Sequence, residues 1–344
     1  MFKFFLIIVL ISIVFYNCKK QPPNFLEKQQ QLLGQYLFFE TKLSINNTKS
    51  CASCHSPNFA FTDGYRTSVT PQGENLLHNA PSLINSVYLK YYDWANPSAT
   101  SLLAQIKRPL YNHQPTELGL DKHIKALKLF FKKDSLYSNL FKQAFPDSDS
   151  LYTLTQIEDA IVAYEKILVS TDSDFDKNNL SIDAQKGYQL FMSNKLKCVK
   201  CHPPPYFTLA TQTNSIDSVY ANIGLYKVGN KNEYPTTDNG IIVFTKNKKD
   251  DGKFKIPSLR NVLLTAPYMH DGSIANIEDV IDMYARGGRK INTDDGKLNA
   301  NKSKLITGFS ITTKEKNDLI HFLNALTDSS IFYKQIFKNP HKKM

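Results

Sequence analysis

Two copies of one short motif constrain this chain more than any other feature of its sequence. Residues 51–55 and residues 198–202 both have the pattern C-x-x-C-H. Two thiols one helical turn apart can add to the two vinyl groups of a porphyrin, while the adjacent imidazole ligates the iron. The spacing therefore predicts two covalently bound c-type haems. Their attachment residues would be Cys51, Cys54, Cys198 and Cys201, and their iron ligands His55 and His202.

Two other interpretations of these motifs are weaker. A zinc site built from one motif would lack a fourth ligand, and a redox dithiol would need thioredoxin-like surroundings that the sequence does not offer. Four of the five cysteines lie in the two motifs, which leaves only Cys18 outside them. The haem interpretation accounts for all four.

The first residues predict export. Lys3 is followed by an almost unbroken apolar run over residues 4–16, shorter than the about 20 residues that a membrane-spanning helix needs. We interpret residues 1–17 as a signal peptide. The segment resembles a bacterial lipoprotein signal, which predicts lipidation at Cys18 and a tether over residues 18–25. An uncleaved anchor with a free thiol is the alternative, and both place the folded part on the periplasmic side of a membrane.

The overall charge limits the choice of partner. The chain has 344 residues, enough for two domains, and a formal net charge of +11. Its basic residues are spread along the length and form no clustered stripe, so we predict no binding to nucleic acid. The basic excess favours an acidic protein partner.

An internal repeat supports two halves with one haem each. The pattern G-x-x-L-F occurs at residues 34–38 before the first motif and at residues 187–191 before the second. Between the motifs, the polar residues 170–179 predict a linker. The predicted units are an N-terminal domain over residues 26–172, a C-terminal domain over residues 178–330 and a tail over residues 331–344.

Helical patterns dominate the remaining sequence. Two capping boxes predict helix starts. They are formed by Thr155 with Glu158, before residues 157–168, and by Thr312 with Glu315, before residues 319–326. Alternating strand patterns are missing, and the polar residues 211–255 lack helical periodicity. We predict a mainly α fold with one long irregular excursion.

Several further motifs resemble the di-haem bacterial cytochrome c peroxidase superfamily, which includes the methylamine-utilisation di-haem enzyme. They follow the family's order at residues 37–44, 61–64, 79–83, 115–119, 254–261 and 265–272. The resemblance implies two cytochrome-c-like helical domains whose haems face one another across the domain interface. It also implies that hydrogen peroxide reacts at the N-terminal haem and that electrons enter at the C-terminal haem.

The resemblance assigns two residues to the peroxide site. Glu117 is implied as the acid/base and Gln105 as the hydrogen-bond donor that holds peroxide, roles that suit a carboxylate and an amide. Many family members close this haem with a His from a nearby loop, but residues 68–77 contain none. For the nearest one, His78, a haem-propionate partner and an axial ligand are both open. The departure predicts a peroxide haem that is open without prior reduction.

The resemblance also implies a calcium ion and an electron route between the haems. The matching calcium ligands are the Asn79 side chain and the backbone carbonyls of Thr265 and Pro267, in line with the cation's preference for oxygen. Tyr92 falls on the position of an aromatic residue in the family's electron route. Trp94, the single tryptophan, lies two residues later, and either residue is a candidate.

The sixth ligand of the C-terminal haem divides the superfamily between Met and Tyr. A helix predicted to begin at Asn276 carries Tyr284 on its apolar face, whereas Met283 is displaced toward the edge of that face. The family's axial position also falls on Tyr284, with Met283 and Met269 as alternatives. An anionic phenolate favours ferric iron, so Tyr284 predicts a low-potential second haem.

Three functions follow from these expectations. The leading one is a cytochrome c peroxidase that reduces hydrogen peroxide to water with electrons from a small c-type cytochrome or copper protein. The second is oxidation of a protein partner through high-valent iron, which a tyrosine ligand would favour. The third is non-catalytic electron transfer, which the Gln105 and Glu117 pair argues against. Formation of a homodimer is left open.

Overall fold

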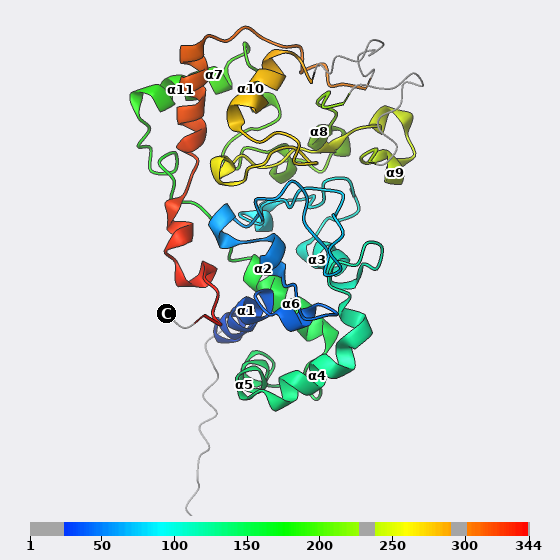
Figure 1. The fold of residues 1–344 in the computed structure, drawn as a ribbon. Coiled ribbons are helices and arrows are strands. Elements are labelled where there is room, and N and C mark those ends of the chain that lie inside the picture. Colours follow the sequence, from blue (N-terminus) through cyan, green and yellow to red (C-terminus); the bar gives the residue numbers. More distant parts are fainter. Residues whose placement is uncertain (1–23, 227–237, 290–300, 343–344) are drawn as a thin grey trace, which may run out of the picture.

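The computed structural model describes residues 24–226, 238–289 and 301–342. Figure 1 shows two helical halves, the N-terminal one below in blue to green and the C-terminal one above in green to orange. The prediction of a mainly α fold is confirmed. The predicted signal peptide, Cys18 and most of the tether lie outside the described residues. Within the described ranges, no helix is both long and apolar enough to span a membrane.

The N-terminal half packs around two crossing helices. Its helices are α1 (Phe25–Phe38), α2 (Cys51–Cys54), α3 (Leu102–Tyr111), α4 (Ile124–Lys133), α5 (Ser135–Ala144) and α6 (Leu154–Glu165). α1 lies against α6 and α5, and the core between them includes Leu33, Leu37 and Ile161, all of them fully or almost fully buried. Each such side chain contributes about 1.5–3 kcal/mol through its burial.

The C-terminal half repeats this arrangement and adds a small strand pair. Its helices are α7 (Ile182–Met192), α8 (Ile216–Val219), α9 (Ile242–Thr245), α10 (Ile277–Ala285) and α11 (Thr313–Asn324). α7 lies against α11 as α1 does against α6. Strands β1 (Tyr220–Ala221) and β2 (Phe254–Lys255) pair antiparallel, with Tyr220 opposite Lys255.

One glycine in each half lets two helices touch. A Cβ atom at Gly34 would overlap a backbone oxygen of α6, and one at Gly187 would overlap a backbone oxygen of α11. The crossing partners are Ala160 and Tyr164 on α6, and Asp318 and Phe322 on α11. Because both glycines belong to the G-x-x-L-F patterns, the predicted internal repeat is confirmed in the helix packing.

A second pair of equivalent residues follows the haem motifs. Asn85 and Asn261 have φ values of 61° and 58°, a region that Asn tolerates better than most residues. Each accepts a backbone N–H with its side-chain oxygen, from Ser170 and Asp328 respectively. Both end a Pro-Ser-Leu-x-Asn sequence. The repeat therefore extends further along the chain than the pattern that predicted it.

Two of the predicted helix starts are confirmed and one is wrong. The capping box at Thr312 begins α11, and the Asn276 side chain caps α10. The predicted cap at Thr155 lies inside α6, because Thr153 and Gln156 form the capping box there. Thr153 has extended backbone angles and accepts the N–H of Gln156, so the helix begins earlier than predicted.

Two segments predicted to be irregular are better ordered than their composition suggests. Ser170, in the polar run predicted as a linker, is fully buried, and the Asn85 side chain bonds its backbone N–H and oxygen. In the excursion predicted over residues 211–255, the described parts contain α8, α9 and both strands. These helices have four residues each, too few to produce a helical period in the sequence.

Residues 331–342 return to the N-terminal half, where Figure 1 shows them in red near α1. The Gln35 side chain donates hydrogen bonds to the backbone oxygens of Gln335 and Lys338, at 3.0 and 2.9 Å. Phe337 is buried and packs edge-to-face against Phe61. The end of the chain is therefore part of the N-terminal core.

Candidate functional site

The first motif forms a short helix that places its histidine in the interior. Ser50 and Ser53 form a capping box on α2, and His55 follows the helix. Nδ1 of His55 lies 3.0 Å from the backbone oxygen of Phe61. A carbonyl only accepts, so Nδ1 carries the proton and Nε2 keeps its lone pair. Burial also lowers the pKa of His55. A neutral imidazole with a basic Nε2 suits iron ligation.

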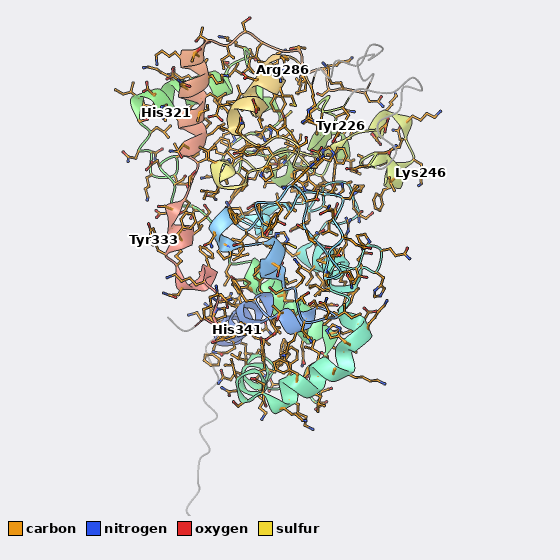
Figure 2. The ribbon with its side chains drawn as sticks, viewed as in Figure 1. Tyr226, Lys246, Arg286, His321, Tyr333 and His341 are labelled. Atoms are coloured by element: carbon orange, nitrogen blue, oxygen red, sulfur yellow. The ribbon has the colours of Figure 1, made fainter. Side chains whose placement is uncertain are left out.

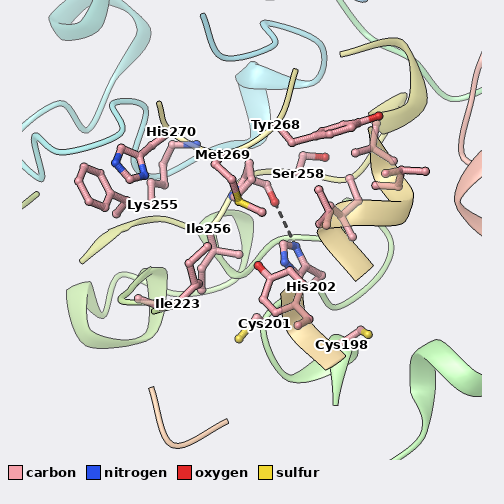
Figure 3. Close-up of a pocket in the computed structure, with 18 of the residues that line it drawn as sticks. Cys198, Cys201, His202, Ile223, Lys255, Ile256, Ser258, Tyr268, Met269 and His270 are labelled. Atoms are coloured by element: carbon pink, nitrogen blue, oxygen red, sulfur yellow. Dashed lines mark hydrogen bonds between the residues drawn. The ribbon is translucent and has the colours of Figure 1, made fainter. Parts of the chain in front are cut away.

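The second motif gives its histidine the same chemistry on a 3₁₀ turn, Cys198–Lys200. Nδ1 of His202 lies 3.0 Å from the backbone oxygen of Phe207 and 3.2 Å from that of Pro257. Burial lowers the pKa of His202 to about 4. His202 is therefore also neutral, with Nε2 left for a metal (Figure 3).

The four motif cysteines form no disulfide with one another, and burial disfavours their thiolate forms. Burial raises the pKa of Cys54 to about 11 and that of Cys198 to about 12. Such thiols are poor nucleophiles for disulfide exchange. In the described ranges, no group of three or more His, Cys, Asp or Glu side chains is arranged to hold a metal ion. The redox-dithiol and zinc interpretations therefore find no support at these motifs.

A largely apolar cavity lies beside the second motif (Figure 3). Cys198, Cys201 and His202 line it. The apolar side chains of its wall include Phe191, Ile277, Ile281, Leu319 and Leu323. Two thiols and a neutral imidazole on apolar walls fit a covalently bound porphyrin.

The cavity distinguishes the three candidates for the sixth ligand. Tyr284 and Met269 line it, whereas Met283 is not part of its wall. Met283 is 1% exposed and packs with Leu225 and Ile274, in a cluster that Tyr284 and Met269 also contact. This placement agrees with the predicted displacement of Met283, and the sixth ligand itself stays a prediction. Burial raises the pKa of the Tyr284 phenol, so this side chain stays protonated unless a metal cation stabilises the phenolate.

Gln105 and Glu117 form the polar part of the first site. Gln105 lies on α3, and its side-chain oxygen is buried with no hydrogen-bond partner among the described residues. Glu117 lies close enough to Cys54 to contribute to the raised pKa of that thiol. Burial raises the pKa of Glu117 itself, although the Arg108 guanidinium, with Nε 3.9 Å from Oε1, opposes the shift. The carboxyl is thus suited to exchange protons.

Sequence inspection missed two residues that surround Glu117. Arg108 lies one turn after Gln105 on α3, and it also forms an ion pair with Asp93. Asp93 is buried, and its other carboxylate oxygen accepts the N–H of Ala95. A signal was present, because Gln105 and Arg108 are three residues apart and share one helix face.

His78 lies at the interface between the halves. Its Nε2 is 3.1 Å from Oδ2 of Asp238, and Nε2 of His270 is 3.3 Å from the same oxygen. Burial would raise the pKa of Asp238, but the two histidines outweigh it and lower the pKa to about 2. The His270 ring stacks on Phe254 at 3.5 Å. A carboxylate of the C-terminal half therefore holds His78.

The three residues predicted to bind calcium border one space. Asn79, Thr265 and Pro267 all line the cavity beside the second motif. The Asn79 amide donates to the backbone oxygen of Tyr65 at 2.9 Å, which fixes its orientation. The three positions thus lie on the wall of one cavity, and calcium itself stays a prediction.

Trp94 and Tyr92 take different positions between the motifs. Trp94 lines the second cavity, and its indole N–H donates to the backbone oxygen of Asn79 at 2.8 Å. Burial and the nearby Glu165 raise the pKa of Tyr92, and Glu165 also contributes to the raised pKa of Cys51. Trp94 thus lines the second cavity and Tyr92 lies near Glu165, and both stay candidates for the electron route.

The repeated helix crossing, the two neutral histidines and the buried thiols fit the class of c-type cytochromes. Residues 28–185 match the family model described as di-haem cytochrome c peroxidase. Cytochrome-c peroxidase IdrP1 of Denitromonas iodatirespirans is 32% identical over 328 residues, which cover 86% of this chain and 80% of that protein. The chain belongs to the di-haem cytochrome c peroxidase family, and the predicted resemblance is confirmed.

Two further similarities point to the other branch of the family. Methylamine utilization protein MauG of Methylorubrum extorquens is 29% identical over 311 residues, covering 88% of this chain and 79% of that protein. The crystal structure of a MauG-like protein associated with microbial copper homeostasis has a TM-score of 0.86 and 36% identity, over 92% of this chain and 94% of the other. Membership implies two c-type haems and an oxidoreductase of the peroxidase type.

Proposed function

We propose that this chain reduces hydrogen peroxide at the site of His55 and passes the resulting oxidising equivalents to a protein partner. The pairing of a buried, unpartnered Gln105 oxygen with a Glu117 carboxyl of raised pKa carries this proposal. Bound haem would supply the iron at which peroxide reacts and the electrons that it takes up. Reduction to two waters consumes two electrons and two protons, so the site needs a proton donor.

Glu117 can serve as that donor. Its raised pKa lets the carboxyl accept a proton from one oxygen of peroxide and return it to the other. Arg108 stabilises the carboxylate between these two transfers. The Gln105 side-chain amide can orient the peroxide, because its N–H donates to a peroxide oxygen and its unpartnered Oε1 accepts the peroxide O–H. A plain electron-transfer protein would have no use for this group of residues.

The first site is proposed to react in the diferric protein. Residues 68–77 contain no His that could close it, and Nε2 of His78 is engaged by Asp238. These observations support an open site without prior reduction of the second haem.

The second site favours a particular use of the oxidising equivalents. We propose Tyr284 as its sixth ligand because Tyr284 lines the cavity and Met283 does not; Met269 is the alternative. A phenolate lowers the potential of the iron. This supports, as a second candidate, MauG-type oxidation of a specific protein, besides peroxidase turnover with a small c-type cytochrome or copper protein. Calcium at Asn79 and lipidation of an exported chain at Cys18 complete the proposal.

Rapid mixing with hydrogen peroxide tests the function. The diferric protein and the one-electron-reduced protein are mixed separately, with reduced cytochrome c present in a second series. We expect a spectral reaction in both states, followed by oxidation of the cytochrome if the peroxidase candidate is right. Reaction with peroxide but no oxidation of small donors would favour the protein-oxidation candidate. No reaction in either state would refute both.

A further inference from the structure

We propose that Lys255 is an anion-binding residue at the domain interface, and that it pairs with a propionate carboxylate of the haem attached at Cys198 and Cys201. The inference uses the assignment of a haem to His202 and is independent of peroxide chemistry. Lys255 ends β2, two residues before Pro257, whose backbone oxygen bonds His202.

The Lys255 side chain is buried without a counter-ion. Its residue is 4% exposed, and among the described residues no carboxylate lies within ion-pair distance of its ammonium. Burial lowers the pKa of Lys255 to about 8, although Asp93 opposes the shift from farther away. A buried charge is costly unless it is paired. The charged Lys255 ammonium would therefore be stabilised by an anion that is not part of the polypeptide.

The ammonium lies where such an anion would arrive. Lys255 lines the same cavity as His202 and Tyr284, and Figure 3 shows it on the cavity wall near His270. In a porphyrin, the propionates lie on the edge opposite the two vinyl groups, so a haem attached at Cys198 and Cys201 would direct its propionates away from these cysteines. Propionates are the anionic groups that a haem brings with it.

The other cations of the cavity already have partners. Arg260 forms a bidentate ion pair with Asp176 at 2.7 Å, and Lys195 pairs with Glu315. Lys197 also lines the cavity, but it is only half-buried and its ammonium donates to the Thr307 hydroxyl at 3.4 Å. Within the described residues, Lys255 is therefore the buried cation of this wall that has no carboxylate partner. The anion would therefore bind at Lys255.

Contacts with Trp94 position both the backbone and the side chain of Lys255. Its backbone N–H donates to the backbone oxygen of Trp94 at 2.8 Å, and its ammonium lies 5.5 Å from the centre of the Trp94 ring. The Trp94 indole is itself held by Asn79. A propionate bound here would lie beside the tryptophan proposed for the electron route.

Two spectroscopic measurements on the haem-loaded protein test the proposal. Lys255→Met is compared with Lys255→Arg and with Lys253→Met, which removes a lysine already paired with Asp217 and Asp250. In Lys255→Met, we expect the reduction potential of the second haem to fall, because its propionate loses a positive neighbour. We also expect its propionate bending mode in resonance Raman spectra to shift. Lys255→Arg and Lys253→Met should keep both near wild-type values.

An unchanged bending mode in Lys255→Met would overturn the proposal, even with a lowered potential, because a general charge effect would explain the potential alone. A shift confined to the first haem would also overturn it. If Lys255→Met does not retain haem, Lys255→Gln takes its place. Neither measurement uses peroxide, so failure of the proposed function would leave this test intact.

Discussion

The two halves share one helix crossing and differ in the residue that follows it. Tyr164 and Phe322 occupy equivalent places against Gly34 and Gly187, so Glu165 corresponds to Leu323. Leu323 lines the apolar cavity of the second site, whereas Glu165 is a buried carboxyl near Cys51. The comparison shows that one repeated frame places a buried carboxyl near the first motif and an apolar leucine near the second, through a single difference at equivalent positions.

The polar residues of the first site should matter most. Glu117→Gln or Gln105→Leu should lower peroxide turnover by about 100-fold or more, the scale of a general acid–base group, while both haems stay attached. The measurement is steady-state turnover with haem content as the control. The exposed Glu74→Gln serves as the matched variant. Turnover close to wild type in Glu117→Gln would remove this residue from the mechanism.

Tyr284 should determine the spectrum of the second haem. Tyr284→Phe should change the sixth ligand of the second ferric haem, seen by electronic absorption and electron paramagnetic resonance. Met283→Leu should leave the spectrum unchanged, because Met283 does not line the cavity. The assignment is wrong if the methionine variant alone loses the ligand, and a change in Met269→Leu instead would move the ligand to that residue.

The glycine at each helix crossing should be important for the stability of the half that contains it. Gly34→Ala and Gly187→Ala should each lower the free energy of unfolding by about 1–3 kcal/mol or more, because the added methyl meets backbone atoms that cannot turn aside. Denaturant unfolding of the holoprotein measures this effect. Lys28→Ala on the exposed side of α1 should change it little. Equal stability of Gly34→Ala and wild type would contradict the close crossing.

Glu165 should make stability depend on pH. Burial raises the pKa of Glu165 to about 8 in the folded protein, above its unfolded value near 4.5. Between these two pKa values the folded state keeps this carboxyl protonated, whereas the unfolded state loses the proton. The free energy of unfolding is therefore highest below the unfolded pKa and falls as pH rises toward 8, by at most about 1.4 kcal/mol per pH unit. Glu165→Gln should flatten this slope in urea titrations. A slope that persists would assign it to another group.

The proposed calcium should have the smallest effect, since it involves a few ligands between the halves. A chelator should lower turnover, and added calcium should restore it. Asn79→Ala should weaken this response. Active protein without calcium in elemental analysis would end the assignment.

Features that depend on a few consecutive residues were easier to predict from the sequence than features that depend on long-range burial. C-x-x-C-H specifies its haem through local spacing, and the Thr312 capping box depends on four consecutive residues, so both could be inferred directly. The cap at Thr155 failed because Thr153 offers an equally good box two residues earlier. Glu165 and Lys255 could not be singled out, because their importance comes from burial by segments far away in the chain.

We propose that the two haem sites are unequal, the first open and polar and the second closed by Tyr284. Electron paramagnetic resonance of the diferric protein, titrated with hydrogen peroxide without any reductant, distinguishes the two sites. We expect one of the two ferric signals to disappear first, and Glu117→Gln to slow that loss. Equal reaction of both signals, or of neither until one haem is reduced, would contradict the claim.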